Sequence, residues 1–387
     1  MKKIIISIII IFIITGCYNY NELNNYSIAT GMAIDLTDDN NYLVSFLISN
    51  GKKTESSNNN SEYQSVLYSG EGKTIYEAIK NIDLISSKQL YIGHLNTIII
   101  SEDVAKLGLY DSLEFLIEDS QSKKNFYVVL AKDNKAKDIL SITTPMTDFT
   151  SQGIAENIKS SYKLQGSIIV KTFNDVIYEL INDGIDTAIT SYVIVGDVKE
   201  GSTLKNLESI EPNTYIKLDK LGIFKGDKLV TWADQDIGKG INIINNDVDE
   251  LYINIPCKNG NIVINTSNLK TNITVSKNKV DINTKGIASI REVTCNIDLE
   301  KIDNIKLVQD KINKQIEDLI NNSFKFAQNY ETDIFGFGLN FYRNNPREYK
   351  NNNWYNLFKN IKPSISVDIQ IKNNSALKQS LERISNE

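Results

Sequence analysis

One cysteine, Cys17, directly follows an apolar run in "IIIIFIITGC", and its position indicates a covalently modified thiol rather than a structural cysteine of the folded protein. Lys2 and Lys3 precede an apolar stretch over residues 4–14 that only Ser7 interrupts. Such a stretch is too short to cross a hydrocarbon core of about 30 Å as a helix. A basic start followed by a short apolar region is the layout of a secretory signal peptide. The thiol at the end of this region is therefore the first candidate for chemistry.

The four residues that end this region resemble a bacterial lipobox. Ile14 is branched and apolar, Thr15 and Gly16 are small, and Cys17 follows. In lipoproteins with this pattern the thiol is diacylglyceryl-modified, with chains such as palmitate, and the polypeptide is cut just before it. Two acyl chains, at about 0.8 kcal/mol per buried CH₂, hold a protein on a bilayer. We expect residues 1–16 to be a lipoprotein signal peptide and Cys17 to be the tether, with an uncleaved N-terminal anchor as the alternative.

Side chains that could form a reaction centre are scarce. His94 is the only histidine, so multi-histidine metal sites and most histidine-dependent triads are excluded. It precedes an apparent core strand in "LYIGHLNTIII", and a structural role is the favoured interpretation. Carboxylate pairs such as Asp38–Asp39 and Asp234–Asp236 are expected by chance among 48 acidic residues. We therefore predict a non-enzymatic protein with no catalytic residue, no cofactor and no metal site.

Composition limits the kinds of partner. Hydrophobic residues make up 41% of the 387-residue chain, enough to bury a core, and the formal net charge is −6. Removing Lys2 and Lys3 with the signal peptide would take two positive charges, giving −6 − 2 = −8. An acidic protein is repelled by phosphate-rich surfaces. We therefore expect no nucleic-acid partner, and membrane attachment through the lipid alone.

Two further cysteines would remain after export. Cys257 and Cys295 lie in "INIPCKNG" and "REVTCNIDL", which both resemble strands. A disulfide between them is conceivable, because an exported protein meets oxidising surroundings. Two buried free thiols are nevertheless the favoured interpretation.

The first half of the chain predicts mixed helices and strands. Residues 28–35 and 42–49 form a predicted hairpin around "TDDNN", and a helix is predicted to begin after Thr74. "LNTIIIS", "NFYVVLAK" and "AITSYVIVGDV" are predicted strands, with a helix over 173–181. The order lacks the regular alternation of a doubly wound sheet.

The second half predicts a sheet and one long helix. "LGIFKGDKLV" indicates a hairpin that turns at residues 225–227, and residues 251–298 are a succession of alternating strands. Apolar residues at steps of three and four from Ile302 to Ala327 predict a helix that covers one face of that sheet. The predicted class is α+β and multi-domain. Its parts are an N-terminal mixed α/β domain over 17–198, a small β-rich middle piece over 214–250, and a C-terminal antiparallel sheet covered by one long helix over 251–375.

Several segments together resemble one family, the lipoprotein C subunits of spore germinant receptors, Ger(x)C. The resemblance begins at Gly16-Cys17 and "ELN", continues through "GKTIYEAIKNIDLISSKQLYIGHLNTIIISEDVAKLG" and "LGIFKGDKLV", and ends with "ETDIFGFGLNFYRNNPREYKNNNWYNLF". It spans nearly the whole chain in order. This sequence departs from the family pattern at Tyr18-Asn19, Ile223, Thr231 and Tyr349, which leaves partner specificity open.

The resemblance implies a role in nutrient sensing. It implies a non-enzymatic lipoprotein on the outer face of the spore inner membrane, beside integral-membrane A and B receptor subunits. A substrate-binding lipoprotein of a transporter is the alternative, although the sheet with a single long helix does not supply that class's second lobe. A cell-wall hydrolase is a third, weaker interpretation.

The C-terminal motif has two open interpretations. Gly336 and Gly338 allow positive φ, so the chain can turn sharply after the long helix. Ile334, Phe335 and Phe337 would then fill the gap between helix and sheet, and this core role is favoured. The rival is an exposed aromatic contact with a membrane partner, to which Phe341, Tyr342, Trp354, Tyr355 and Phe358 would contribute. The residues of this structural or interface motif are Asp333, Ile334, Phe335, Gly336, Gly338 and Trp354.

Overall fold

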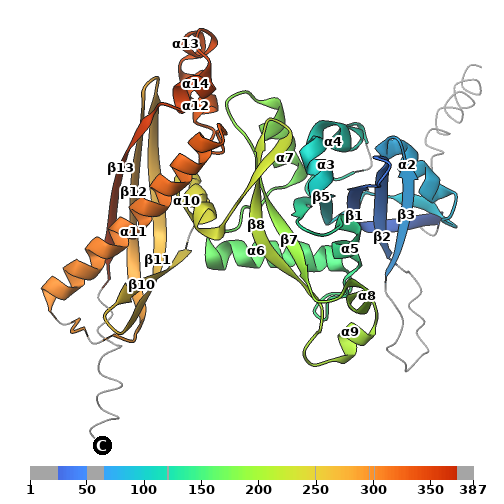
Figure 1. Ribbon diagram of the computed structural model, residues 1–387, viewed down its shortest axis with the longest axis horizontal. Helices are drawn as coiled ribbons and strands as arrows, with labels where there is room; N and C mark the ends of the chain where they lie inside the picture. Colours follow the sequence, from blue (N-terminus) through green and yellow to red (C-terminus); the bar gives the residue numbers. More distant parts are fainter. Residues whose placement is uncertain are drawn as a thin grey trace, which may run out of the picture.

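The structure is a computed structural model, and it describes most of the chain after the N-terminal region (Figure 1). Cys17 and the predicted signal peptide lie outside the described residues, so both stay predictions. The described ranges are 25–49, 65–119, 122–248, 250–295, 297–299 and 301–372.

A nine-stranded mixed sheet forms the first part of the molecule. The hairpin predicted around "TDDNN" is confirmed, with β1 and β2 antiparallel and Asn40 at φ 59° in the turn. β5 and β6 pair in parallel and are almost wholly buried, as apolar strands covered on both faces must be. In pairing order the strands are β3 (Ser65–Gly72), β2 (Tyr42–Ser49), β1 (Tyr26–Leu36), β5 (Thr97–Ser101), β6 (Tyr127–Ala131), β7 (Ala188–Val195), β8 (Tyr215–Lys225) and β9 (Lys228–Ala233), with β4 (Gln89–Tyr91) beside β1.

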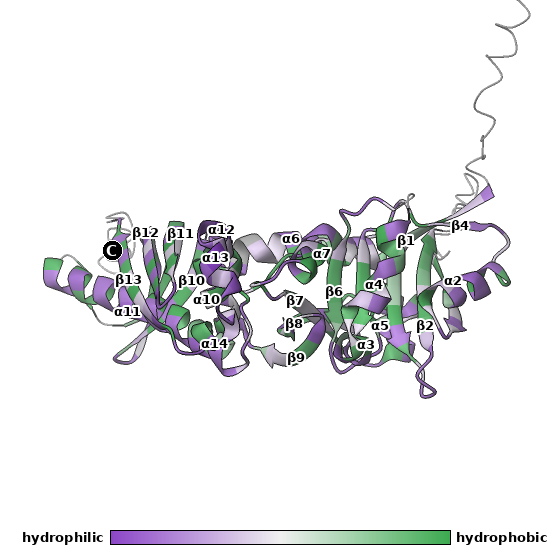
Figure 2. Ribbon diagram, turned by 90° about the horizontal axis from the view of Figure 1, so that it is seen from above, coloured by the Kyte–Doolittle hydropathy of each residue, from purple (hydrophilic) through white to green (hydrophobic). Residues whose placement is uncertain are grey.

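Short helices cover this sheet. Seen from above, hydrophobic residues concentrate in central strands such as β6, and helices flank them (Figure 2). Helix α2 begins where predicted, because the Thr74 hydroxyl accepts a hydrogen bond from the Glu77 N–H at 3.1 Å. The helices of this part are α2 (Ile75–Asp83), α3 (Glu102–Leu107), α4 (Leu109–Glu118), α5 (Ala136–Ser141), α6 (Thr150–Gln165), α7 (Phe173–Ile181), α8 (Val198–Gly201) and α9 (Lys205–Glu208).

Residues 214–250 bridge the two parts of the molecule. The predicted hairpin at 225–227 is confirmed, with Gly226 at φ 60° between β8 and β9. β8 pairs with β7, so this hairpin continues the nine-stranded sheet. Helix α10 (Gln235–Asn245) follows and packs against the long helix α11 (Ile302–Asn329). An added Cβ at Gly240 would lie 2.3 Å from the Leu319 carbonyl oxygen, so glycine permits this close helix approach.

The second sheet has four strands and one covering helix. The α+β multi-domain class is confirmed, and α11 lies across the sheet as predicted (Figure 1). The last strand corrects the prediction of an antiparallel sheet, because β13 pairs with β12 in parallel. The crossover through α11 returns the chain to the start of β12, so the two strands run the same way. The strands are β10 (Glu250–Cys257), β11 (Gly260–Ser276), β12 (Lys279–Val293) and β13 (Lys362–Ile371).

The expectation of two free thiols is wrong, because Cys257 and Cys295 form a disulfide with Cα atoms 6.2 Å apart. The β10–β11 hairpin places Cys257 opposite Gly260. The Thr294 N–H donates to the Asn261 carbonyl at 2.9 Å, which brings the end of β12 to the same place. The register of three strands therefore makes the pairing.

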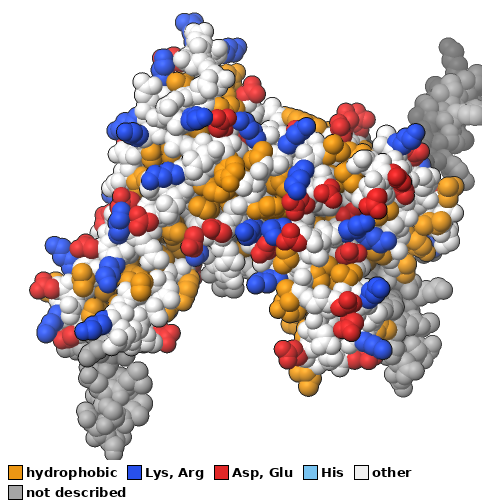
Figure 3. Space-filling view, in the orientation of Figure 1, with side chains coloured by type: hydrophobic (Ala, Val, Ile, Leu, Met, Phe, Trp, Pro, Cys, Tyr) orange, Lys and Arg blue, Asp and Glu red, His pale blue; other side chains and the backbone are white. Residues whose placement is uncertain are grey.

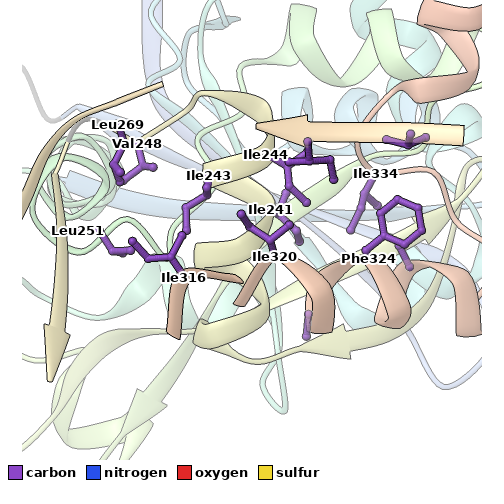
Figure 4. Close-up of a cluster of buried hydrophobic side chains, with 14 of the residues drawn as sticks. Ile241, Ile243, Ile244, Val248, Leu251, Leu269, Ile316, Ile320, Phe324 and Ile334 are labelled. Carbon is purple, nitrogen blue, oxygen red and sulfur yellow. The ribbon is translucent and has the colours of Figure 1, made fainter. Parts of the chain in front are cut away.

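One hydrophobic cluster joins the two parts. It includes Leu221 and Ile223 of β8 as well as side chains of α10, α11 and the second sheet. Figure 4 shows side chains of α10 and α11 pointing toward one another, among them Ile241 and Ile320. A shared core of this kind couples the two sheets energetically, since separating them would expose apolar surface at about 25 cal/mol per Å².

Candidate functional site

Two buried carboxylates lie where the two parts of the molecule meet. Asp333 follows α11 and is fully buried, and Asp186, in the loop between α7 and β7, is 3% exposed. We call the group formed by Asp186, Asp333, Gly226, Trp354 and Tyr355 the carboxylate junction. Buried carboxylates are costly unless hydrogen-bonded, so their partners define what this site does.

Asp333 organises the motif that follows it. Its Oδ2 accepts hydrogen bonds from the Gly338 N–H and the Trp354 Nε1–H, both at 2.7 Å. Its Oδ1 accepts from the N–H groups of Phe335 at 3.3 Å and Phe337 at 3.2 Å. One carboxylate thus receives four donors from "DIFGFG" and from α14 (Trp354–Phe358). It fixes the turn that leads into α12 (Phe337–Asn344) and, before α14, α13 (Pro346–Lys350).

Asp186 connects this turn to the first sheet. Its Oδ2 accepts from the Asp333 N–H at 2.7 Å, and its Oδ1 accepts from the Gly226 N–H at 2.8 Å. Its own N–H donates to the Asp333 carbonyl at 2.9 Å, and the Tyr355 side chain is a further hydrogen-bond partner. Three segments far apart in sequence therefore meet at one side chain. These hydrogen bonds give Asp186 a structural role, because they hold the three segments together.

Glycines permit the close approach of the chain segments at the carboxylate junction. Gly184 has φ 79° and accepts from the Leu339 N–H at 2.8 Å. A Cβ on Gly338 would lie 2.5 Å from Trp354 Nε1 and 2.8 Å from the Gly184 Cα atom. Gly336, at φ 69°, sits in the left-handed region that favours glycine. The two motif glycines thus serve different needs, one backbone conformation and the other space.

The aromatic residues of the motif face inward. Phe337 and Trp354 are under 4% exposed, Ile334 is 5% exposed, and Phe335 is half-buried. Ring centroids lie 4.9 Å apart for Phe335 and Phe337 and 5.5 Å apart for Phe341 and Trp354. Such pairs add about 0.5–1.5 kcal/mol beyond area burial. The structure thus places most of the motif in the core, while Tyr342 is 38% exposed.

Burial sets the acidity of the junction. It raises the pKa of Asp333 to about 7, opposed by the Gly338, Phe337 and Trp354 donors and reinforced by the charge of Asp186. Burial likewise raises the pKa of Asp186, with the Gly226 and Asp333 N–H groups acting against it. The Asp333 carboxyl therefore titrates near neutral pH.

A surface ion-pair group lies beside the junction. Glu331 contacts Lys225 at 2.9 Å and Lys359 at 2.8 Å, which links the β8–β9 hairpin to the C-terminal part. The hydrogen bonds from Lys359 and Lys225 lower the pKa of Glu331 to about 2. All three side chains are over 40% exposed, so solvent screens these pairs and the buried carboxylates dominate.

The other candidate side chains are not brought together. His94 is exposed, with its ring 5.8 Å from that of Tyr91. Asp234 caps α10 through the Ile237 N–H at 3.0 Å, and Asp236 pairs with Lys239. Within the described ranges no group of three or more His, Cys, Asp or Glu side chains is arranged to hold a metal ion. No helix in that part of the chain is long and apolar enough to cross a membrane.

Sequence reasoning found one half of the junction and missed the other. The C-terminal motif predicted from the sequence includes Asp333 and Trp354, but Asp186 in "NDGIDTAIT" belongs to no predicted motif. Its partner lies 147 residues away, and no spacing rule connects them. Glycine was the available sequence signal for a tight turn at this site, because Gly184, close to Asp186 in sequence, and Gly226, close to it in space, both adopt positive φ.

This chain is a multi-domain α+β protein whose C-terminal motif locks two sheets together, and comparison with family models identifies its family. "Spore germination protein N-terminal domain" matches residues 19–195, and "Spore germination B3/ GerAC like, C-terminal" matches residues 219–375. Together they cover most of the chain in the expected order. The chain therefore belongs to the GerAC-like spore germination protein family, the Ger(x)C family of germinant-receptor C subunits that its sequence resembles.

Relatives and a solved structure agree with this assignment. The chain is 23% identical over 360 residues to spore germination protein KC of Bacillus subtilis (strain 168), covering 89% of this chain and 88% of that protein. It is 26% identical over 138 residues to spore germination protein B3 of the same organism, covering 35% and 36% of the two chains. The crystal structure of the GerBC protein matches with a TM-score of 0.51 at 16% identity, covering 92% of this chain and 100% of that one. That likeness supports the fold.

Proposed function

We propose that this protein is the lipid-anchored C subunit of a nutrient germinant receptor. Diacylglyceryl modification of Cys17 tethers it to the outer face of the spore inner membrane. There it assembles with the integral-membrane A and B subunits and acts without catalysis. The observation that carries the proposal is the ordered match of both spore germination family models across residues 19–195 and 219–375.

The junction and the surface fit such an assembly role. The carboxylate junction holds two sheets in one arrangement, which gives partners a fixed surface to recognise. On the face that Figure 3 shows, basic and acidic side chains are interspersed over the described residues. This mixture fits protein partners better than a phosphate backbone, which selects a continuous basic surface. The alternative of a transporter's substrate-binding lipoprotein gains no support from the family match.

Purification from spore membranes tests the proposed assembly. An affinity-tagged protein is extracted in mild detergent, and the proteins that co-purify are identified by mass spectrometry. We expect two integral-membrane germination subunits with the wild-type protein. The variant Cys17→Ala is expected to lose both the acyl groups and membrane retention. Recovery of the wild-type protein without any membrane subunit, after cross-linking, would contradict the proposal.

A further inference from the structure

Two adjacent apolar side chains protrude into solvent at the C-terminal end of helix α2. Leu84 is 82% exposed and Ile85 is 56% exposed. Among the exposed large hydrophobic residues of the described ranges, these two alone are consecutive in the chain. Single apolar residues are common on protein surfaces, whereas residues that gather there often mark a site of contact. We call Leu84 and Ile85 the α2 tip.

The backbone of the α2 tip is held in a fixed turn. The N–H groups of Ile85 and Ser86 both donate to the Ile82 carbonyl oxygen at 3.0 Å. The side chain of Ile82 is fully buried, which attaches the turn to the core. The Ser86 hydroxyl donates to the Lys88 carbonyl oxygen at 2.6 Å. The turn that carries the two apolar side chains is therefore ordered before any partner binds, which lowers the entropic cost of binding.

The α2 tip lies beside the start of β1, from which the chain leads back to Cys17. β1 begins at Tyr26 and pairs in parallel with β4, so that Tyr26 lies opposite Gln89. The side-chain oxygens of Ser27 and Ser86 lie 3.4 Å apart, and Ser86 directly follows the tip. The tip and the first strand are therefore neighbours in space.

A tether at Cys17 would bring this end of the molecule to the membrane. The nine residue steps from Cys17 to Tyr26 span at most about 32 Å, even when fully extended. Helices α2 and α11 lie toward opposite ends of the long axis in Figure 1. If Cys17 is lipid-modified, as proposed above, the bilayer surface is therefore near α2 and far from most of α11.

The α2 tip carries little charge that would oppose contact with lipid headgroups. The segment 84–91, "LISSKQLY", contains no acidic residue, and its one charged side chain, Lys88, is exposed. Asp83, just before the tip, is paired with Lys80 at 2.9 Å. Acidic side chains of α4 line the groove between α2 and α4, but neither residue of the tip lines that groove. The negative charge of the chain is therefore not concentrated at the tip.

We propose that the α2 tip inserts into the membrane as a second, shallow contact beside the lipid tether. Leu84 and Ile85 enter the boundary between headgroups and acyl chains, while Lys88 stays among the headgroup phosphates. Tyr26 and Tyr91 are half-buried with ring centroids 5.4 Å apart, and such rings suit the headgroup level.

This contact would orient the protein on the membrane. A lipid on a flexible chain holds a protein near the bilayer without fixing which face meets it, whereas a second contact at the α2 tip selects one face. The inference replaces the expectation of attachment through the lipid alone. It rests on the proposed function, because only a tether at Cys17 brings the tip to the bilayer.

Tryptophan fluorescence on vesicles tests the contact. The chain from Cys17 onward contains every described residue, and the other two of its three cysteines form the disulfide, so a maleimide lipid couples to Cys17 alone. The vesicles contain phosphatidylcholine and phosphatidylglycerol, with or without bromine on the acyl chains, and bromine quenches a tryptophan that enters the apolar layer. Leu84→Trp is compared with Leu307→Trp, the matched control, because Leu307 is 50% exposed on α11. Both positions are exposed, so neither substitution disturbs the core.

The emission that each variant adds to the wild-type spectrum reports its own position, because Trp232 and Trp354 are common to all three proteins. We expect the emission added by Leu84→Trp to shift to the blue and to lose more than about half its intensity in brominated vesicles, because the side chain reaches the acyl boundary. The emission added by Leu307→Trp should be unaffected.

Equal quenching at the two positions, whether strong or absent, overturns the inference, and absence at both would leave the tip to a protein partner. The tether is tested separately by flotation of the native protein with spore membranes, compared with Cys17→Ala. Native protein that floats, together with equal quenching in the vesicles, contradicts the contact alone. Native protein that does not float contradicts the proposed tether, so the two failures are distinguishable.

Discussion

Replacing Asp333 by asparagine should destabilise the protein by removing half of the acceptor capacity at the junction. The carboxylate accepts four N–H donors, two at each oxygen. Asparagine keeps the shape but offers one oxygen and one NH₂ group. Its better orientation retains the two 2.7 Å bonds from Gly338 and Trp354. The NH₂ group then faces the N–H groups of Phe335 and Phe337, which lose their acceptor.

The magnitude follows from those two donors. A buried donor left unpaired costs about 1–3 kcal/mol, so the Asp333→Asn variant should lose about 3 kcal/mol of unfolding free energy at pH 7.5. Urea unfolding followed by tryptophan fluorescence measures this directly, since Trp354 is part of the junction. The matched control is Asp310→Asn, an exposed position on α11, which should change the unfolding free energy by less than about 0.5 kcal/mol. Equal unfolding midpoints for the two variants would refute the reasoning.

Three further predictions concern pH, space and the disulfide. The folded pKa of Asp333, about 7, lies above the ordinary aspartate value of 3.8, so its stabilisation is present below the unfolded pKa and is lost as pH rises through about 7. Urea unfolding should therefore show wild-type stability falling between about pH 4 and pH 8, by on the order of 4 kcal/mol at most, with a smaller fall in Asp333→Asn; identical slopes would sink this idea. Gly338→Ala should lower the unfolding free energy by more than about 2 kcal/mol, because its Cβ would lie 2.5 Å from Trp354. Gly226→Ala has open space around it and should lower the unfolding free energy by only about 1 kcal/mol, because of its positive φ. The opposite order of the two variants in thermal unfolding would count against the packing argument. The double substitution Cys257→Ala/Cys295→Ala should lower the unfolding free energy by about 3 kcal/mol, and an unchanged urea midpoint would show that the disulfide does not constrain the unfolded chain.

Local patterns predicted the elements that depend on local rules. The three- and four-residue spacing from Ile302 to Ala327 predicted α11, because one helical face must be apolar to cover a sheet. The hairpins at "TDDNN" and "FKGDK" followed from turn residues that tolerate positive φ. The glycine pair in "DIFGFG" indicated a sharp turn, and Gly336 adopts the left-handed conformation there.

Those local rules do not predict which segments far apart in the sequence come into contact. The direction of β13 depends on where α11 delivers the chain, and the residues of the strand itself carry no signal for it. The Cys257–Cys295 bond depends on the register of β10, β11 and β12 together. Asp186 and Asp333 meet only because two sheets share one core. A single sequence does not indicate which distant residues come into contact, because each of these two aspartates is one of 48 acidic residues in the chain.

Nutrient-triggered release of dipicolinic acid from spores tests the central claim, a tethered germinant-receptor subunit, most directly. Spores carrying Cys17→Ala, spores with the gene deleted and wild-type spores are compared across a panel of nutrients. The account predicts that the deletion abolishes the response to at least one nutrient and that Cys17→Ala reproduces the same loss. Normal release from Cys17→Ala spores, alongside a defect in the deletion, would contradict the tether. Normal release from deletion spores on every nutrient would contradict the receptor role itself.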